Sequence, residues 1–335
     1  MEPTWIWQQP DWPAFRWHEA EITPLVQAVR FKLGLLLGKS AADGQSDRRH
    51  TFDSLLINIL ASSAIEDEKL NAQSVRSSLA KRLGISDAAP YPTSGRSEGL
   101  AEMMLDAIAN LDSPLTLERL LHWHRWLFPS QALSLYDIRA GQLRGEEPMQ
   151  VVSGRIDRPK VHFIAPPRQV IDAEIERFLA WFNQSHRDRQ PDLLLRAAIC
   201  RFWFVTLHPF DDGNGRITRA LTDLALAQAD NQTMRLYAMA AAILKQRGEY
   251  YQVPEQSQRG TLDITRWLAW FLNTLVTTLD DALTAMDKIL LKNRFWQHVY
   301  QAGLAIRQVK VLNRLLDGGD NGFKLGISAA QYPPG

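Results

Sequence analysis

One segment, residues 193–207, is apolar on nearly every side, and this pattern restricts the fold more than any other feature of the chain. Only Arg196 and Arg201 interrupt it with charge. A helix that is apolar all round must be enclosed by other elements or by lipid. The segment is shorter than the ~20 residues that a bilayer requires, so we expect no membrane span. It should therefore form the buried centre of a helical bundle.

The rest of the chain offers helices that can enclose this centre. Apolar residues recur at helical spacing in most of the remaining sequence. The exception is 149–164, where two short β-rich runs flank a glycine-containing turn and predict a hairpin. We therefore predict an all-α helical bundle with a small β-hairpin and an N-terminal helical domain. The expected helices cover 22–38, 51–66, 71–83, 103–111, 117–128, 170–182, 217–229, 264–290 and 306–316.

A stretch dense in Pro, Ser and Gly at 90–99 is the best internal linker. It predicts an N-terminal helical domain at 1–92 and a central domain at 93–290. A C-terminal helical segment at 291–335 would follow, and its abrupt end resembles the start of a truncated winged-helix domain.

The balance of charges and the single cysteine limit the partners and the cellular compartment that the sequence favours. Lys and Arg number 38 against 37 Asp and Glu, so a nucleic-acid partner is not favoured and any anion site must be local. The single cysteine, Cys200, cannot form an intrachain disulfide, and the N-terminus does not read as a signal peptide. We therefore expect a cytoplasmic protein. His122 and His124 are interpreted as structural, because two-residue spacing on a helix is poor metal geometry.

The densest chemistry lies in residues 208–219, which read HPFDDGNGRITR. The proline ends the preceding helix, and the glycines leave a turn of bare amides at the start of the next one, which is a ready anion site. Arg216 and Arg219 are three residues apart and can fork onto phosphate oxygens from one helix face. Asp212 is a hard oxygen ligand suited to Mg²⁺, and His208 is suited to a general base. Each feature alone has an ordinary interpretation, but the combination predicts phosphate chemistry.

This stretch resembles, at every fixed position, the His-Pro-Phe-x-x-Gly-Asn-Gly-Arg-x-x-Arg signature of the Fic family. The resemblance implies a bacterial-type protein adenylyltransferase (AMPylation), which moves AMP from Mg·ATP to a Ser, Thr or Tyr hydroxyl of a target protein. It also implies the site residues: His208 as base, Asn214 with the Gly213 and Gly215 amides at the α-phosphate, Asp212 as the Mg²⁺ ligand, and Arg216 and Arg219 at the β- and γ-phosphates.

Two further features fit the same family. The hairpin at 149–164 matches the place of a flap that docks the target as an added strand, through Val151, Val152, Val161, His162 and Phe163; an ordinary structural hairpin is the alternative. Tyr250 and Tyr251 resemble an aromatic pair near the adenine, with core packing as the alternative.

A second motif precedes the presumed linker. Ser62 and Glu66 fit the Ser/Thr-x-x-x-Glu-Gly/Asn motif of the N-terminally autoinhibited class, in which the glutamate pairs with the second motif arginine. Asp67 departs from the Gly/Asn position and puts the local turn in question. Without the first motif, Glu66 would be interpreted as a surface charge.

Other functions remain open at this point. The same site could transfer another nucleotide or phosphate group, or could remove AMP with Glu66 orienting water. From another class, a DNA-associated regulator could sense nucleotide without turnover. Self-modification and a homodimer are further possibilities.

Overall fold

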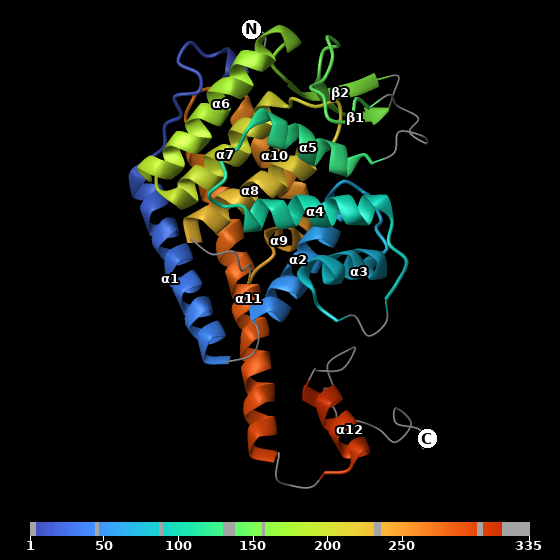
Figure 1. The fold of residues 1–335 in the computed structure, drawn as a ribbon. Coiled ribbons are helices and arrows are strands. Elements are labelled where there is room, and N and C mark those ends of the chain that lie inside the picture. The colour runs from blue at the N-terminus through green and yellow to red at the C-terminus, as the bar shows by residue number, and fades with distance from the viewer. Residues whose placement is uncertain are drawn as a thin grey trace. The chain divides into compact units, whose positions relative to one another are not determined.

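The computed structural model describes residues 5–43, 47–86, 90–129, 138–155, 158–230, 236–299 and 304–316. These residues are mainly helical and carry one two-stranded sheet, which confirms the all-α prediction (Figure 1). A short 3₁₀ turn at Ile6–Gln8 precedes the helices. The elements are α1 (Glu19–Asp43), α2 (Asp47–Ile65), α3 (Ala72–Leu83), α4 (Gly95–Ala109), α5 (Leu117–Leu127), β1 (Gln150–Arg155), β2 (Arg158–Ile164), α6 (Arg168–Asp188), α7 (Leu193–Leu207), α8 (Asn214–Asp230), α9 (Met239–Lys245), α10 (Arg247–Gln258), α11 (Thr265–Val299) and α12 (Ile306–Leu316).

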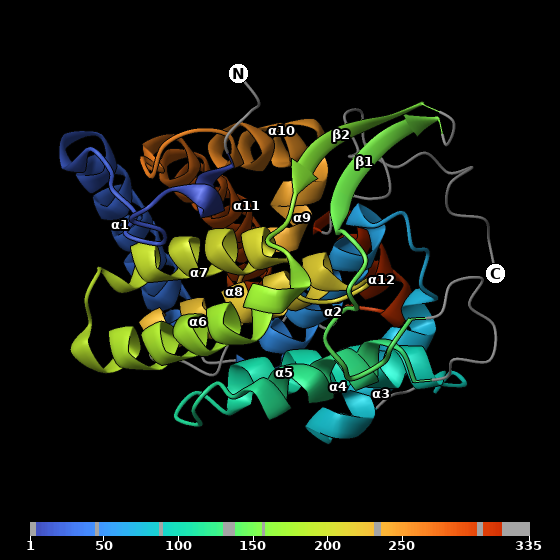
Figure 2. The same cartoon turned by 90° about the horizontal axis from the view of Figure 1, so that it is seen from above.

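Helix α7 is the buried centre that its composition predicts. All of its residues except Val205 are buried, and α6 and α8 pack along it (Figure 2). The buried guanidinium of Arg196 donates to the Ser185 hydroxyl, the Gln228 side chain and the Phe182 carbonyl. These bonds offset the cost of burying a cation, although burial still lowers the pKa of Arg196 to about 10.

The predicted hairpin is present as the antiparallel pair β1 and β2. Val151 pairs with Phe163 and Val152 pairs with Val161, so His162 is the extra residue of a bulge. The hairpin extends beyond the helices that surround its base (Figure 2).

Helices α2 and α3 correspond to the predicted helices at 51–66 and 71–83. The side chain of Asn71 accepts hydrogen bonds from the backbone N–H groups of Gln73 and Ser74, and this cap fixes the start of α3. Helix α2 ends at Ile65, so the residues of the second motif lie in its last turn and just beyond it.

One local prediction is wrong over half of its length, and two helices were not predicted. The supposed linker at 90–99 is half helix, because the Ser94 hydroxyl accepts from the Ser97 N–H and starts α4 at Gly95. Helices α9 and α10 were not expected. Helix α10 contains Pro254, a residue that reads as a helix breaker in sequence.

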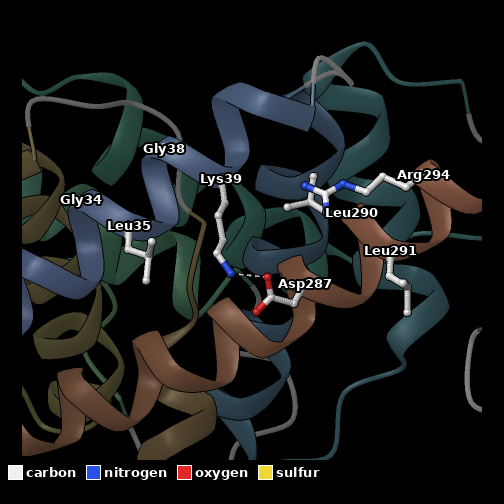
Figure 3. A pocket seen from close by; sticks show the side chains of 8 residues that line it. All are labelled: Gly34, Leu35, Gly38, Lys39, Asp287, Leu290, Leu291 and Arg294. Carbon is white, nitrogen blue, oxygen red and sulfur yellow. Dashed lines mark hydrogen bonds and ion pairs between the residues drawn. The ribbon is translucent and has the colours of Figure 1, made fainter.

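The contacts within the chain divide it into two compact units, residues 1–30 with 46–278 and residues 31–45 with 279–335. The first unit contains α2 to α10. In the second, Lys32 pairs with Asp280 and Lys39 with Asp287, and a crevice opens beside the latter pair (Figure 3). The predicted boundaries at 92 and 290 remain predictions, and about half of the expected C-terminal segment at 291–335 lies outside the described residues. No described helix combines the length and apolarity that crossing a membrane requires.

Candidate active site

The site is built on the turn that joins α7 to α8. Helix α7 ends because His208 adopts a left-handed backbone with φ of +49°, and Pro209 follows. The side chain of Asn214 then closes the turn on itself: its oxygen accepts from the Phe210 N–H at 3.0 Å and its amide donates to the Phe210 carbonyl at 2.8 Å. Both polar groups of Asn214 are thus used to hold the turn, a role that the sequence did not predict.

His208 has the protonation state that a general base needs. Its Nδ1 lies 3.2 Å from the Val205 carbonyl, so Nδ1 carries the proton and Nε2 keeps its lone pair. Burial lowers the pKa of His208 below the ordinary 6.5. The imidazole is therefore neutral at pH 7.

Arg144 braces the backbone of the turn, and sequence reasoning missed it. Its Nε donates to the His208 carbonyl and its N–H to the Pro209 carbonyl, each at 2.9 Å, while Nη2 donates to the Pro166 carbonyl. The side chain is 2% exposed. A lone arginine in an irregular segment gave no signal of this role.

His124, from α5, supports the opposite side of the turn. It accepts the Gly141 N–H at Nδ1 (2.8 Å), so Nε2 carries the proton and donates to the Asp212 carbonyl (3.1 Å). Its ring stacks on Phe210 with centroids 4.3 Å apart. His124 therefore has a structural role, as predicted, and the element that it supports is the turn between α7 and α8.

Asp212 is the more exposed of the two carboxylates in the turn, because Asp211 pairs with Arg139. Its carboxylate is 56% exposed, with Oδ1 accepting the Gly213 N–H at 2.6 Å and Oδ2 lying 3.5 Å from Arg216. Gly213 has φ of +78°, a conformation that favours glycine. In the described residues, no cluster of three or more His, Cys, Asp or Glu side chains forms a metal site. One exposed carboxylate fits Mg²⁺ that takes its other ligands from water and substrate phosphates.

Arg219 is buried against the second motif. Its side chain is 3% exposed; Nε donates to the Ser62 hydroxyl (2.7 Å), and Nη2 donates to the Ser62 carbonyl and to Glu66 Oε1 (2.8 Å each). Glu66 also lies over Gly215, where an added Cβ would come within 2.2 Å of Oε1. The structure therefore brings Ser62, Glu66 and Arg219 together as the resemblance implies.

Asp67 does not disturb this turn. It adopts the left-handed conformation with φ of +57°, which explains why a motif of this kind favours Gly or Asn there. Arg247 from α10 donates to both carboxylate oxygens at 2.6 and 2.5 Å, and its hydrogen bonds hold the pKa of Asp67 below its usual value.

A second acidic residue of the same turn, Glu68, was not predicted to act. Its Oε2 accepts from Arg216 Nη1 at 2.8 Å, and its Oε1 forms an ion pair with Arg96 from α4. Each of the two motif arginines thus forms an ion pair with a carboxylate from the segment that follows α2. A charge run of the type Glu-Asp-Glu-Lys reads as a solvated surface, so sequence alone gave no sign of this pair.

Of the two tyrosines Tyr250 and Tyr251, the structure describes only the side chain of Tyr250. The Tyr250 hydroxyl lies 3.3 Å from Arg219 Nη1, and its buried ring packs against Trp270. Tyr250 thus contacts the arginine assigned to the terminal phosphates, and adenine contact stays a prediction. The side chain of Tyr251 lies outside the described residues.

The hairpin is anchored at its base. The backbone carbonyls of Val161 and His162 accept from Arg259 at 3.2 and 3.1 Å, and His162 Nδ1 lies 2.7 Å from Glu255. Phe163 is 2% exposed and packs edge-on against Trp5, so its side chain anchors the hairpin, and its part in backbone docking of a target stays a prediction. Val151 is half-buried. Val152 is 50% exposed and remains available.

Two regions of the chain match known protein families. Residues 114–226 match the Fic/DOC family, and residues 5–85 match a domain of unknown function, DUF4172. A protein adenylyltransferase Fic from Drosophila ananassae is 29% identical over 115 residues, which are 34% of this chain and 21% of that protein. The match thus spans about a fifth of the curated relative.

Solved structures show the same fold. A Fic family protein from Desulfovibrio desulfuricans G20 has a TM-score of 0.58 at 21% identity, covering 89% of this chain and 80% of its own. Fic-1 from C. elegans has a TM-score of 0.51 at 21% identity, covering 80% of this chain and 76% of its own. Residues 114–226, which contain His208 and Arg219, therefore form a Fic domain, and the chain shares the fold of these solved structures.

Proposed function

We propose that this protein transfers AMP from Mg·ATP to a Ser, Thr or Tyr hydroxyl of a target protein, and that Glu66 restrains the reaction. The observation that carries the proposal is the arrangement of one turn. A neutral imidazole with a free Nε2 lone pair stands at its start, and two buried arginines stand on the helix that follows. The curated relative named as a protein adenylyltransferase supports AMP as the transferred group.

His208 would act on the incoming hydroxyl. Its Nε2 takes the hydroxyl proton as the oxygen attacks the α-phosphorus of ATP. A new P–O bond forms there, the bond to the β-phosphate oxygen breaks, and pyrophosphate leaves. Because Nδ1 stays on the Val205 carbonyl, the imidazolium is held in orientation during the step.

The remaining groups of the turn and of α8 would stabilise the negative charge of the ATP phosphates. The amides at the start of α8 face the α-phosphate, and Arg216 and Arg219 bind the β- and γ-phosphates, which become the leaving group. Asp212 would hold Mg²⁺, which neutralises phosphate charge when bound. Asn214 acts in this scheme by fixing the turn through Phe210.

Autoinhibition follows from the position of Glu66. Its carboxylate occupies a guanidinium nitrogen of Arg219 that a γ-phosphate would need, so ATP would bind in an unproductive pose. Both motif arginines lie in the region that matches the Fic/DOC family, whereas Glu66 lies in the region that matches DUF4172. We therefore assign 1–92 to an inhibitory N-terminal domain and 93–290 to the catalytic domain.

Intact mass spectrometry tests the proposal. Proteins of a bacterial lysate are incubated with Mg·ATP and the Glu66→Gly protein, with the His208→Ala, Glu66→Gly double variant as the matched control. A mass increase of one AMP on a protein, present only with the first variant, supports adenylyl transfer. An increase of one phosphate, or loss of AMP from a modified protein, would replace it with one of the other reactions.

A further inference from the structure

We propose that Arg96 is a third arginine of the phosphate site, and that Glu68 stands where a terminal phosphate of ATP binds. The inference rests on the proposed function, because it names a further residue that holds the same nucleotide. Arg96 lies outside the signature motif and between the two matched regions of the chain.

The contacts of Glu68 define the site. One oxygen of its carboxylate accepts from Arg216 Nη1 at 2.8 Å, and the other forms an ion pair with Arg96. A single anion thus bridges two guanidinium groups, one from α8 and one from α4. Each guanidinium group contacts this anion through one nitrogen, and two arginines that converge on one anion in this way can bind a phosphate group.

Arg216 needs an anion at this place. Its side chain is 5% exposed, and its Nε has no hydrogen-bond partner among the described residues. Asp212, whose Oδ2 lies 3.5 Å from Arg216, is a more distant second carboxylate. Removing Glu68 without a replacement would leave a buried cation poorly paired, which is costly. The site therefore favours exchange of Glu68 for another anion.

The position of Arg96 allows that exchange. Its side chain is 40% exposed, whereas that of Glu68 is 18% exposed. Arg96 can thus follow an incoming phosphate from the solvent side, while Arg216 binds it from the buried side. Glu66 and Glu68 come from one turn and occupy Arg219 and Arg216, so the turn supplies two carboxylates where a polyphosphate would supply two phosphates.

Calorimetric titration with Mg·ATP, pyrophosphate and AMP tests this assignment. Glu68→Gln should raise the affinity for Mg·ATP and pyrophosphate but not for AMP, which lacks the terminal phosphates. In the Glu68→Gln background, Arg96→Gln should weaken Mg·ATP and pyrophosphate binding by roughly tenfold or more, the scale of a charge-assisted contact. Arg96→Lys should fall between, because it keeps the charge and loses the fork.

Arg82→Gln in the same background is the matched control. Arg82 ends α3 and pairs with Glu102 of α4, so its loss removes the same charge from the same region. It should leave all three affinities unchanged, and equal melting temperatures would show that the variants fold alike.

The two possible failures are distinguishable. Mg·ATP binding that survives unchanged in Arg96→Gln, or that falls equally for AMP, would overturn the role of Arg96 alone. Absence of Mg·ATP binding in the Glu68→Gln protein would overturn the proposed function and this inference with it.

Discussion

Replacing Glu66 with glycine removes the carboxylate on Arg219, and the structure predicts faster AMP transfer as a result. Arg219 would not lose its place, because the Ser62 hydroxyl, the Ser62 carbonyl and the Tyr250 hydroxyl still contact its guanidinium. The substitution therefore frees one charged donor in an arginine that is already oriented.

The magnitude follows from the geometry of the pair. Opposite unit charges at 4 Å attract by ~4 kcal/mol at an effective dielectric constant of about 20, and desolvation offsets part of this. A hydrogen bond to a charged group is worth ~1.5–3 kcal/mol net. Because the Glu66 side chain is 33% exposed, the lower half of that range applies. Since ~1.4 kcal/mol changes a rate tenfold, we expect transfer to rise by roughly ten- to thirtyfold.

The assay measures initial rates of α-phosphate transfer at saturating Mg·ATP with an identified target. Glu66→Gln is the matched control: it retains an acceptor for Arg219 without the charge, so its rate should lie between wild type and Glu66→Gly. Arg219→Ala should be slow, and the double variant should resemble it, because the freed arginine is absent. A Glu66→Gly protein no faster than wild type would refute the autoinhibition.

Four further outcomes are expected. His208→Ala should abolish transfer with ATP binding largely intact. In the wild type, the acid limb of kcat/KM should lie below pH 6.5, because the base is protonated only as the pH falls through the lowered pKa of His208. A limb above pH 6.5 would contradict the assignment of His208 as the base. Asp212→Ala should lose the Mg²⁺ dependence of the rate, which a metal titration measures. Asp67→Val should raise transfer because a β-branched residue strains the left-handed turn by ~1–2 kcal/mol, whereas Asp67→Gly should leave inhibition intact. Val161→Pro should weaken modification of protein targets with ATP affinity unchanged, and equal loss of both would make the hairpin merely structural.

Features that depend on neighbouring residues could be predicted from the sequence. The all-round apolarity of 193–207 predicts a buried helix, and the structure confirms it. The motif at 208–219 contains two arginines three residues apart, and this spacing predicts that they lie on one face of the helix that begins there. The cap at Asn71 is likewise readable from local chemistry.

Features that depend on distant packing could not be predicted. Glu68 meets Arg216 across 148 positions of the chain, and in sequence it is one charge in an acidic run. Arg144 and His124 brace the turn from 64 and 88 positions away, through backbone carbonyls that carry no sequence signal. Helix α10 was missed because Pro254 is tolerated within it.

The central claim, transfer of AMP by His208, is tested most directly with labelled nucleotide. The Glu66→Gly protein is incubated with a target and ATP labelled at either the α- or the γ-phosphate, beside the same protein carrying His208→Ala. Label on the target from α-labelled ATP alone, lost with His208→Ala, is the predicted result. Label from γ-labelled ATP, or α-label that persists without His208, would contradict the account.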